Sequence, residues 1–157
     1  MTDASLLPDA VRGLVRVARI VESASGDLSI ADFRVVSIIA SGENSPSRVA
    51  ARLLLSRPTI TATLDSLEKR GLVLRSGVAD DARATALSLT EEGIVLLGRA
   101  EARMSRQLEL LCERTPDAQQ VISSLAWLGD VLEAVVTDRI ARAAAMPEPL
   151  RNLRSTS

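Results

Sequence analysis

Hydroxyl-bearing and basic side chains are concentrated in one short segment of the sequence, residues 56–69. On a helix over residues 57–70, Ile60, Leu64 and Leu67 would form a narrow apolar stripe facing a core. An ordinary solvated face would carry Glu, Lys and Gln, whereas each threonine here costs about half a kcal/mol relative to alanine. Small hydroxyls and arginine are instead suited to phosphates and base edges in a DNA major groove. The candidate contact residues are Ser56, Arg57, Pro58, Thr59, Thr61, Ala62, Ser66 and Lys69.

A second candidate site includes Asp81 and Arg83, which stand two positions apart. The polar run 77–81 predicts the tip of a hairpin, and a tip lying along DNA would place Arg83 in the narrow minor groove. Asp81 would then hold the guanidinium in position. The alternative is a surface salt bridge of negligible value. Arg75 and Ser45 complete the candidate DNA-contacting set.

The composition excludes several other chemistries. The 157 residues include no histidine, which excludes a histidine-based triad, an imidazole base and any histidine-ligated metal. A single cysteine excludes an internal disulfide and a thiolate zinc cluster. That residue, Cys112, follows an apolar stripe, where packing as a small hydrophobe is favoured over redox sensing. We expect no catalytic residue, no metal, no cofactor and no membrane span.

Charge is distributed unevenly, although the formal net charge is only −1. Residues 45–90 hold seven basic and four acidic side chains, whereas residues 91–138 hold four basic and nine acidic ones. This asymmetry favours an anionic partner for the middle of the chain. Random unevenness on a solvated surface is the alternative.

The middle of the chain predicts a series of short elements. Ser29 and Ser56 are suited to cap helices, and Gly71 supplies a left-handed residue that ends one. The predicted elements are helices over residues 29–40, 46–53 and 57–70 and strands over residues 72–76 and 85–89. In this order they are the elements of a winged helix-turn-helix.

Long amphipathic helices are predicted on both sides, in residues 5–25 and 91–145. Thr90 is the expected N-cap of the first helix after the strands, and Thr115-Pro116-Asp117 is expected to start the next. The apolar stripes could pack together within a monomer, but the small middle region cannot cover them all. A dimer with an apolar seam is therefore favoured. The expected seam residues are Leu7, Val11, Leu14, Leu108, Leu111, Leu125, Leu128, Leu132 and Val135.

Residues 28–97 resemble the MarR (multiple antibiotic resistance regulator) family of bacterial transcription factors. The resemblance rests on residues 56–61, 67–73 and 87–93, and on Asp81-Ala82-Arg83, which is similar to the family's Asp-x-Arg wing motif. It implies an obligate dimer whose winged lobes read a pseudo-palindromic operator, with repression released by a small ligand or by oxidation. Two features depart from the family pattern. Ala62 and Ser66 stand where arginine is frequent, and Leu54 stands where the turn often has glycine.

The sequence thus predicts a mainly α (α+β) chain with a winged helix-turn-helix lobe at residues 28–90 and helical dimerisation segments at 5–25 and 91–145. We expect a cytoplasmic homodimer that binds double-stranded DNA and represses transcription. A small lipophilic or anionic effector would release this homodimer from DNA. We expect the effector to bind in a mainly aliphatic pocket, with Arg16 or Arg34 supplying polarity. The alternatives are a winged-helix protein-interaction module without specific DNA binding and a cysteine-based redox-sensing regulator.

Overall fold

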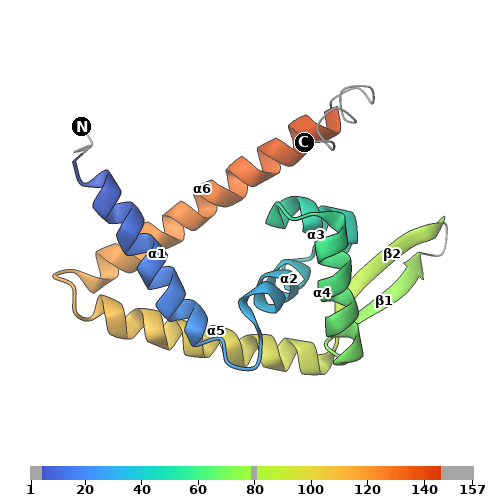
Figure 1. Ribbon diagram of the computed structural model, residues 1–157, viewed down its shortest axis with the longest axis horizontal. Helices are drawn as coiled ribbons and strands as arrows, with labels where there is room; N and C mark the ends of the chain where they lie inside the picture. The colour runs from blue at the N-terminus through green and yellow to red at the C-terminus, as the bar shows by residue number, and fades with distance from the viewer. Residues whose placement is uncertain (1–4, 79–80, 146–157) are drawn as a thin grey trace.

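The computed structural model describes residues 5–78 and 81–145, and within these ranges the chain is mostly helical (Figure 1). The elements are α1 (Leu7–Ser23), α2 (Ile30–Ala40), α3 (Pro46–Leu53), α4 (Arg57–Lys69), β1 (Val73–Val78), β2 (Asp81–Leu89), α5 (Glu91–Cys112) and α6 (Ala118–Ala145). The two strands pair antiparallel, with Val73 opposite Leu89. This order confirms the predicted winged helix-turn-helix between long helices.

Helices α2, α3 and α4 and the hairpin surround one apolar core, and these elements are called the lobe below. The predicted stripe of α4 lies in this core, where Ile60, Leu64 and Leu67 are almost fully buried. A backbone hydrogen bond from Leu87 N to Asn44 O (2.7 Å) ties the hairpin to the loop before α3. The core therefore determines which face of α4 is turned to solvent.

Capping side chains determine where three of the helices begin. In each case a hydroxyl accepts a hydrogen bond from a backbone N–H in the first turn, which otherwise has no helical partner. The bonds are Asp32 N to Ser29 Oγ (3.1 Å), Thr59 N to Ser56 Oγ (3.3 Å) and Gly93 N to Thr90 Oγ1 (3.0 Å). These are the caps that the sequence predicts, and the structure confirms them.

The start of α5 packs directly against the backbone that precedes β1. Thr90 donates two hydrogen bonds to it, from N to Leu72 O (3.1 Å) and from Oγ1 to Gly71 O (2.7 Å). A Cβ at Gly93 would collide with the carbonyl oxygen of Leu72. Glycine is therefore required at this position because the two backbones approach closely.

Three elements, β1, β2 and α6, have bounds that differ from those expected from the sequence. The strands extend farther toward the hairpin tip than predicted, with Gly77 opposite Thr85 and, after a shift in register, Val78 opposite Asp81. Helix α6 begins at Ala118, and Asp117 is its cap, since Gln120 N donates to Asp117 Oδ1 (2.9 Å). Thr115, the expected cap, instead donates its hydroxyl to Cys112 O (2.6 Å) at the end of α5.

The turn between α3 and α4 holds a leucine in the left-handed conformation. Leu54 has φ 54° and ψ 36°. Leu55 N donates to Ala50 O (3.0 Å) and Leu54 N to Ala51 O (3.3 Å), which is the Schellman pattern of a helix end. The Leu54 side chain is exposed, so little burial offsets the cost of this backbone conformation.

Replacing Leu54 with glycine is expected to stabilise the protein by about 1 kcal/mol, because glycine adopts this conformation without a Cβ clash. Urea unfolding at a fixed protein concentration should show a higher midpoint with an unchanged slope. Leu54→Ala is the control, since alanine keeps the clash and should leave the midpoint close to that of the original protein. A lower midpoint for Leu54→Gly would show that the leucine side chain stabilises the fold.

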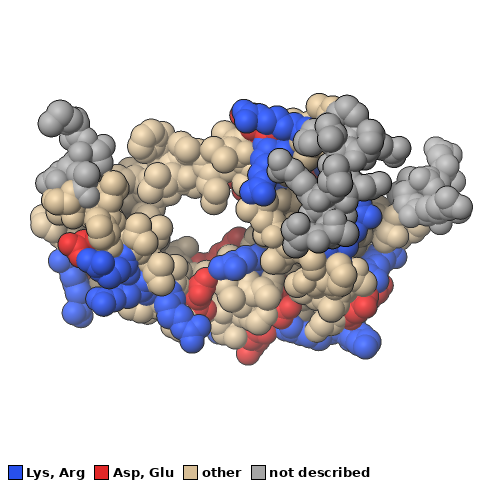
Figure 2. Space-filling model, turned by 45° about the horizontal axis from the view of Figure 1, so that its top comes forward, with Lys and Arg blue, Asp and Glu red and all other residues tan. Residues whose placement is uncertain are grey.

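Helix α5 leads away from the lobe and α6 returns toward α3, while α1 packs on α5 (Figure 1). None of the residues of α1 is buried, and most of α6 is exposed. By length and composition alone, Ala118–Ala143 is apolar enough to cross a membrane. Figure 2 shows a largely uncharged surface along α6 and an opening between this helix and the lobe. The chain therefore leaves a long apolar surface uncovered.

Candidate nucleic-acid interface

The face of α4 opposite its buried stripe is exposed along its whole length. It carries Arg57, Pro58, Thr59, Thr61, Ala62, Ser66 and Lys69, and the exposed Ser56 precedes it. All eight α4-segment residues predicted as DNA contacts thus lie on one side of the lobe. Their side chains are mostly small, which would allow the helix to approach another surface closely.

Local hydrogen bonds distinguish the hydroxyl groups on this face. The hydroxyls of Ser56 and Thr59 are 2.7 Å apart, and Thr63 Oγ1 donates to Thr59 O (3.1 Å). Among the described residues, the hydroxyl of Thr61 has no hydrogen-bond partner. Ser56 therefore serves first as the helix cap, whereas Thr61 is available for an outside partner.

The free positive charges of α4 lie at its two ends. Arg57 at the first position and Lys69 at the last form no ion pair with any residue that the structure describes. Arg70, just beyond the helix, is engaged: it contacts Asp32 (2.9 Å) and donates to Asp27 O (2.9 Å). Arg57 and Lys69 are thus the charges that α4 can offer to an anion.

The structure places Arg75 differently from its predicted role as a DNA contact. Its Nη2 lies 2.7 Å from Asp65 Oδ1 and its Nη1 lies 3.6 Å from Glu68 Oε2, and both carboxylates belong to α4. The alternation of side chains along a strand indicates this inward direction, because Arg75 lies on the same face of β1 as the buried Val73. The charge of Arg75 is balanced inside the lobe, where it fastens the hairpin to α4.

The remaining predicted contacts flank α4. Ser45 is half-buried at the start of α3, with its Oγ 2.9 Å from Ser47 Oγ. Asp81 and Arg83 belong to β2, but their side chains lie outside the described part of the chain. Their pairing at the hairpin tip stays a prediction.

Sequence reasoning missed a charge cluster beneath α3. The buried Glu43 places Oε1 3.0 Å from Arg48 Nε and Oε2 3.9 Å from Arg52 Nη1. Arg52 Nη2 also pairs with Glu133 of α6. Arg48 and Arg52 are four residues apart and therefore share a helix face, which is a usable signal. Glu133 is 81 positions from Arg52, and no sequence pattern links them.

An apolar groove of about 790 Å³ lies between α1, α5 and α6. It is lined by seven of the nine predicted seam residues, namely Leu7, Val11, Leu14, Leu108, Leu111, Leu125 and Leu128. Leu132 and Val135 are exposed farther along α6. Cys112 is buried and also lines the groove. The structure thus brings the predicted seam together from three helices.

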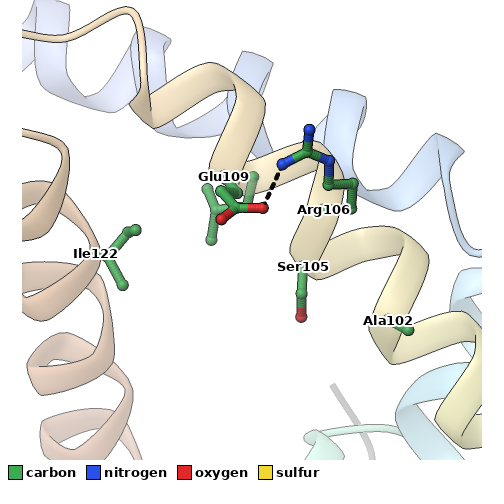
Figure 3. Close-up of a pocket in the computed structure, with 6 residues that line it drawn as sticks. Ala102, Ser105, Arg106, Glu109 and Ile122 are labelled. Atoms are coloured by element: carbon green, nitrogen blue, oxygen red, sulfur yellow. Dashed lines mark hydrogen bonds and ion pairs between the residues drawn. The ribbon is translucent and has the colours of Figure 1, made fainter.

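A smaller hollow of about 430 Å³ shares Leu108 with this groove (Figure 3). Its other lining residues are Ala102, Ser105, Arg106, Glu109 and Ile122. Arg106 Nη1 donates to Glu109 Oε2 (2.6 Å). This hydrogen bond and the negative charges of Glu109 and Glu113 raise the pKa of Arg106 above its ordinary value. The pair is exposed to solvent and lies on α5, outside the lobe.

The two arginines predicted to line an effector pocket line neither of these hollows. Arg34 pairs with Glu22 at 2.9 Å, and Arg16 is exposed on α1. Figure 2 shows basic side chains along the flank formed by α1. Arg16 therefore faces solvent, and Arg34 joins α2 to α1.

Comparisons with known proteins agree with this geometry. A sequence profile described as the MarR family matches residues 26–84, the region from the start of the lobe to β2. The HTH-type transcriptional regulator PecS of Dickeya dadantii (strain 3937) is 29% identical over 96 residues, covering 60% of this chain and 57% of PecS. The HTH-type transcriptional regulator PrsX of Escherichia coli is 37% identical over 93 residues, covering 55% of this chain and 56% of PrsX. The aligned region thus spans little more than half of each relative.

The similarity to solved structures covers more of the chain. The transcriptional repressor CouR bound to a 23-mer DNA duplex has a TM-score of 0.68 and 26% identity, covering 82% of this chain and 93% of CouR. This match includes helices beyond the lobe, because the lobe alone is shorter than the matched fraction. The long helices and the lobe are therefore combined in this chain as they are in a DNA-bound repressor.

Proposed function

We propose that the chain is a member of the MarR family, and that it is a cytoplasmic, homodimeric transcriptional regulator that binds specific double-stranded DNA. The observation that carries the proposal is the exposed face of α4. This face combines small side chains with Arg57 and Lys69, which form no ion pair within the described part of the chain, and the other face of the helix is buried in the core. The DNA duplex bound by CouR supports this choice of partner.

We propose that two copies pair through the apolar groove and the adjoining face of α6. A twofold axis would then present two α4 helices to successive major grooves, with half-site centres about 10 bp apart. A membrane is a poorer partner for α6, because Asp130 and Glu133 lie in the middle of its apolar stretch. Carboxylates at that depth cost several kcal/mol, whereas at the edge of a dimer seam they stay hydrated.

We further propose that the chain is a repressor, as CouR is named, and that a small lipophilic or anionic molecule releases it from DNA. A ligand can do so only by binding the released conformation more tightly than the DNA-bound one. Of the two predicted anion contacts, Arg34 is held by Glu22, whereas Arg16 has no ion pair with any of the described residues.

Arg57→Ala tests the proposed function. If Arg57 reads a base, the substitution is expected to weaken binding to the operator by about 1–3 kcal/mol per half-site, with a much smaller loss on random DNA. Gel shifts of the full chain on duplexes from the region upstream of its own gene, and on random duplexes, measure both affinities.

Arg106→Ala is the matched control, because it removes the same charge from an exposed position on α5. It should leave both affinities unchanged. Equal losses on both DNAs for Arg57→Ala would assign Arg57 to phosphate and transfer specificity to Thr59, Thr61 or DNA shape. Binding to neither DNA would favour the protein-interaction module.

A further inference from the structure

One guanidinium joins the lobe to the long C-terminal helix. Arg52 lies at the end of α3, with Nη1 3.9 Å from Glu43 Oε2 and Nη2 paired with Glu133 of α6. The two carboxylates come from opposite sides of the opening described above: Glu43 is rooted in the lobe and Glu133 lies on α6. The planar fork of arginine offers a separate terminal nitrogen to each carboxylate in a fixed geometry, which the compact ammonium of a lysine does not provide.

The lobe end of this bridge is sheltered from solvent. The side chain of Glu43 is only 7% exposed and is also held by Arg48 (3.0 Å), while that of Arg52 is 25% exposed. Partly buried charges are screened by salt less than exposed ones, and a buried carboxylate needs its cationic partners. The contact with Glu43 therefore holds the Arg52 side chain in a defined position on the lobe, and from this position it contacts Glu133 of α6.

The bridge lies where the lobe meets the returning chain. Helix α5 leaves the lobe from the end of the hairpin, and α6 comes back to pack on α3 (Figure 1). Arg52 and Glu133 supply an ionic contact at this second attachment. Without it, the orientation of the lobe relative to α6 would depend on packing alone.

We propose that Arg52 is a positioning residue: through Glu133 it holds the lobe at one angle to the dimerisation helices and so sets the half-site spacing that the dimer accepts. This inference rests on the proposed DNA-binding function. Arg52 itself is not assigned to the DNA contact, because both of its nitrogen termini face carboxylates.

Glu133→Gln is the principal test, because it removes the negative charge on the α6 side of the bridge and leaves the Glu43–Arg52 contact in the lobe. The matched control is Glu109→Gln on α5. Both substitutions remove one negative charge from an ion pair with arginine, and the two side chains are equally exposed, 54% for Glu133 and 55% for Glu109. Figure 3 shows the Arg106–Glu109 pair that the control interrupts.

The probes are duplexes enriched from a random 24-bp pool by the original protein, then rebuilt with one base pair added between the half-sites. Each added pair rotates one half-site relative to the other, so a rigid dimer loses affinity. We expect at least a tenfold loss for the original protein and for Glu109→Gln, and a loss of threefold or less for Glu133→Gln. Arg52→Lys should behave as Glu133→Gln does, since it keeps the charge but not the fork.

An undiminished tenfold loss in Glu133→Gln would overturn the positioning role. Failure of the original protein to enrich any sequence would instead overturn the proposed function, and a measurement without DNA then decides the inference. Spin labels at Ser47→Cys in α3 and Ser105→Cys in α5, in a Cys112→Ala background with excess unlabelled chain, report the distance from lobe to helix. A broader distance distribution in Glu133→Gln than in Glu109→Gln supports the inference, and equal widths overturn it.

Discussion

Gly93→Ala is expected to destabilise the protein by about 3 kcal/mol, at the upper end for an added methyl group in a packed site. The Cβ would meet the carbonyl oxygen of Leu72, which is backbone and cannot rotate away as a side chain would. Relief requires α5 to move off the lobe. That movement would break the two hydrogen bonds from Thr90 to Leu72 and Gly71. Urea unfolding at constant protein concentration measures the loss.

Gly98→Ala in the same helix is the matched control. No atom lies within 4 Å of a Cβ at Gly98, and the residue is exposed. Alanine there should raise stability by roughly 0.5–1 kcal/mol through helix propensity. If both glycine variants were more stable than the original protein, the backbone of Leu72 would be able to move away from a Cβ at residue 93. The close contact between α5 and the lobe would then not be rigid.

Leu132→Asp is expected to convert the proposed dimer to a monomer at micromolar concentration. Leu132 is 61% exposed in the single chain and lies on the α6 face that we assign to the seam. In the dimer each copy would bury an unpaired carboxylate, and the twofold axis applies the penalty twice. A loss of about 3 kcal/mol corresponds to roughly a hundredfold weaker association. Light scattering over a dilution series measures it.

Leu74→Asp makes the same chemical change at another exposed leucine. Leu74 is 56% exposed on β1, outside the seam, so its substitution should leave the association unchanged. Equal effects of both substitutions would show that general loss of apolar surface, and not a seam on α6, controls association. A folded monomer of 16.7 kDa for the original chain would contradict the dimer itself.

Features that depend on neighbouring residues were predictable from the sequence. Ser56 and Thr90 cap helices because their hydroxyls reach N–H groups three residues away, and the stripe of α4 follows from helical periodicity alone. The exposed face of α4 is the complement of that stripe. The candidate site on α4 therefore needed no knowledge of how distant segments pack.

Features that depend on tertiary pairing were not predictable in the same way. Arg75 was assigned to DNA by its charge, but Asp65 and Glu68 hold it, and only the strand alternation hints at that direction. The pair between Arg52 and Glu133 joins residues 81 positions apart, and no local pattern favours it over other arginine–carboxylate pairs. Charge counts along a chain cannot distinguish side chains that face a partner from those neutralised internally.

Carboxylates within the protein already pair with four arginines of the lobe, namely Arg48, Arg52, Arg70 and Arg75. A protein releases condensed counterions from DNA only where its positive side chains neutralise phosphates. Each such contact adds about 0.9 to the steepness with which the logarithm of the binding constant falls as the logarithm of the salt concentration rises. Within the described part of α4, Arg57 and Lys69 are the side chains free to make such contacts. The proposed DNA binding should accordingly be less sensitive to ionic strength than the seven basic residues of 45–90 suggest, with more of its free energy coming from shape and base contacts.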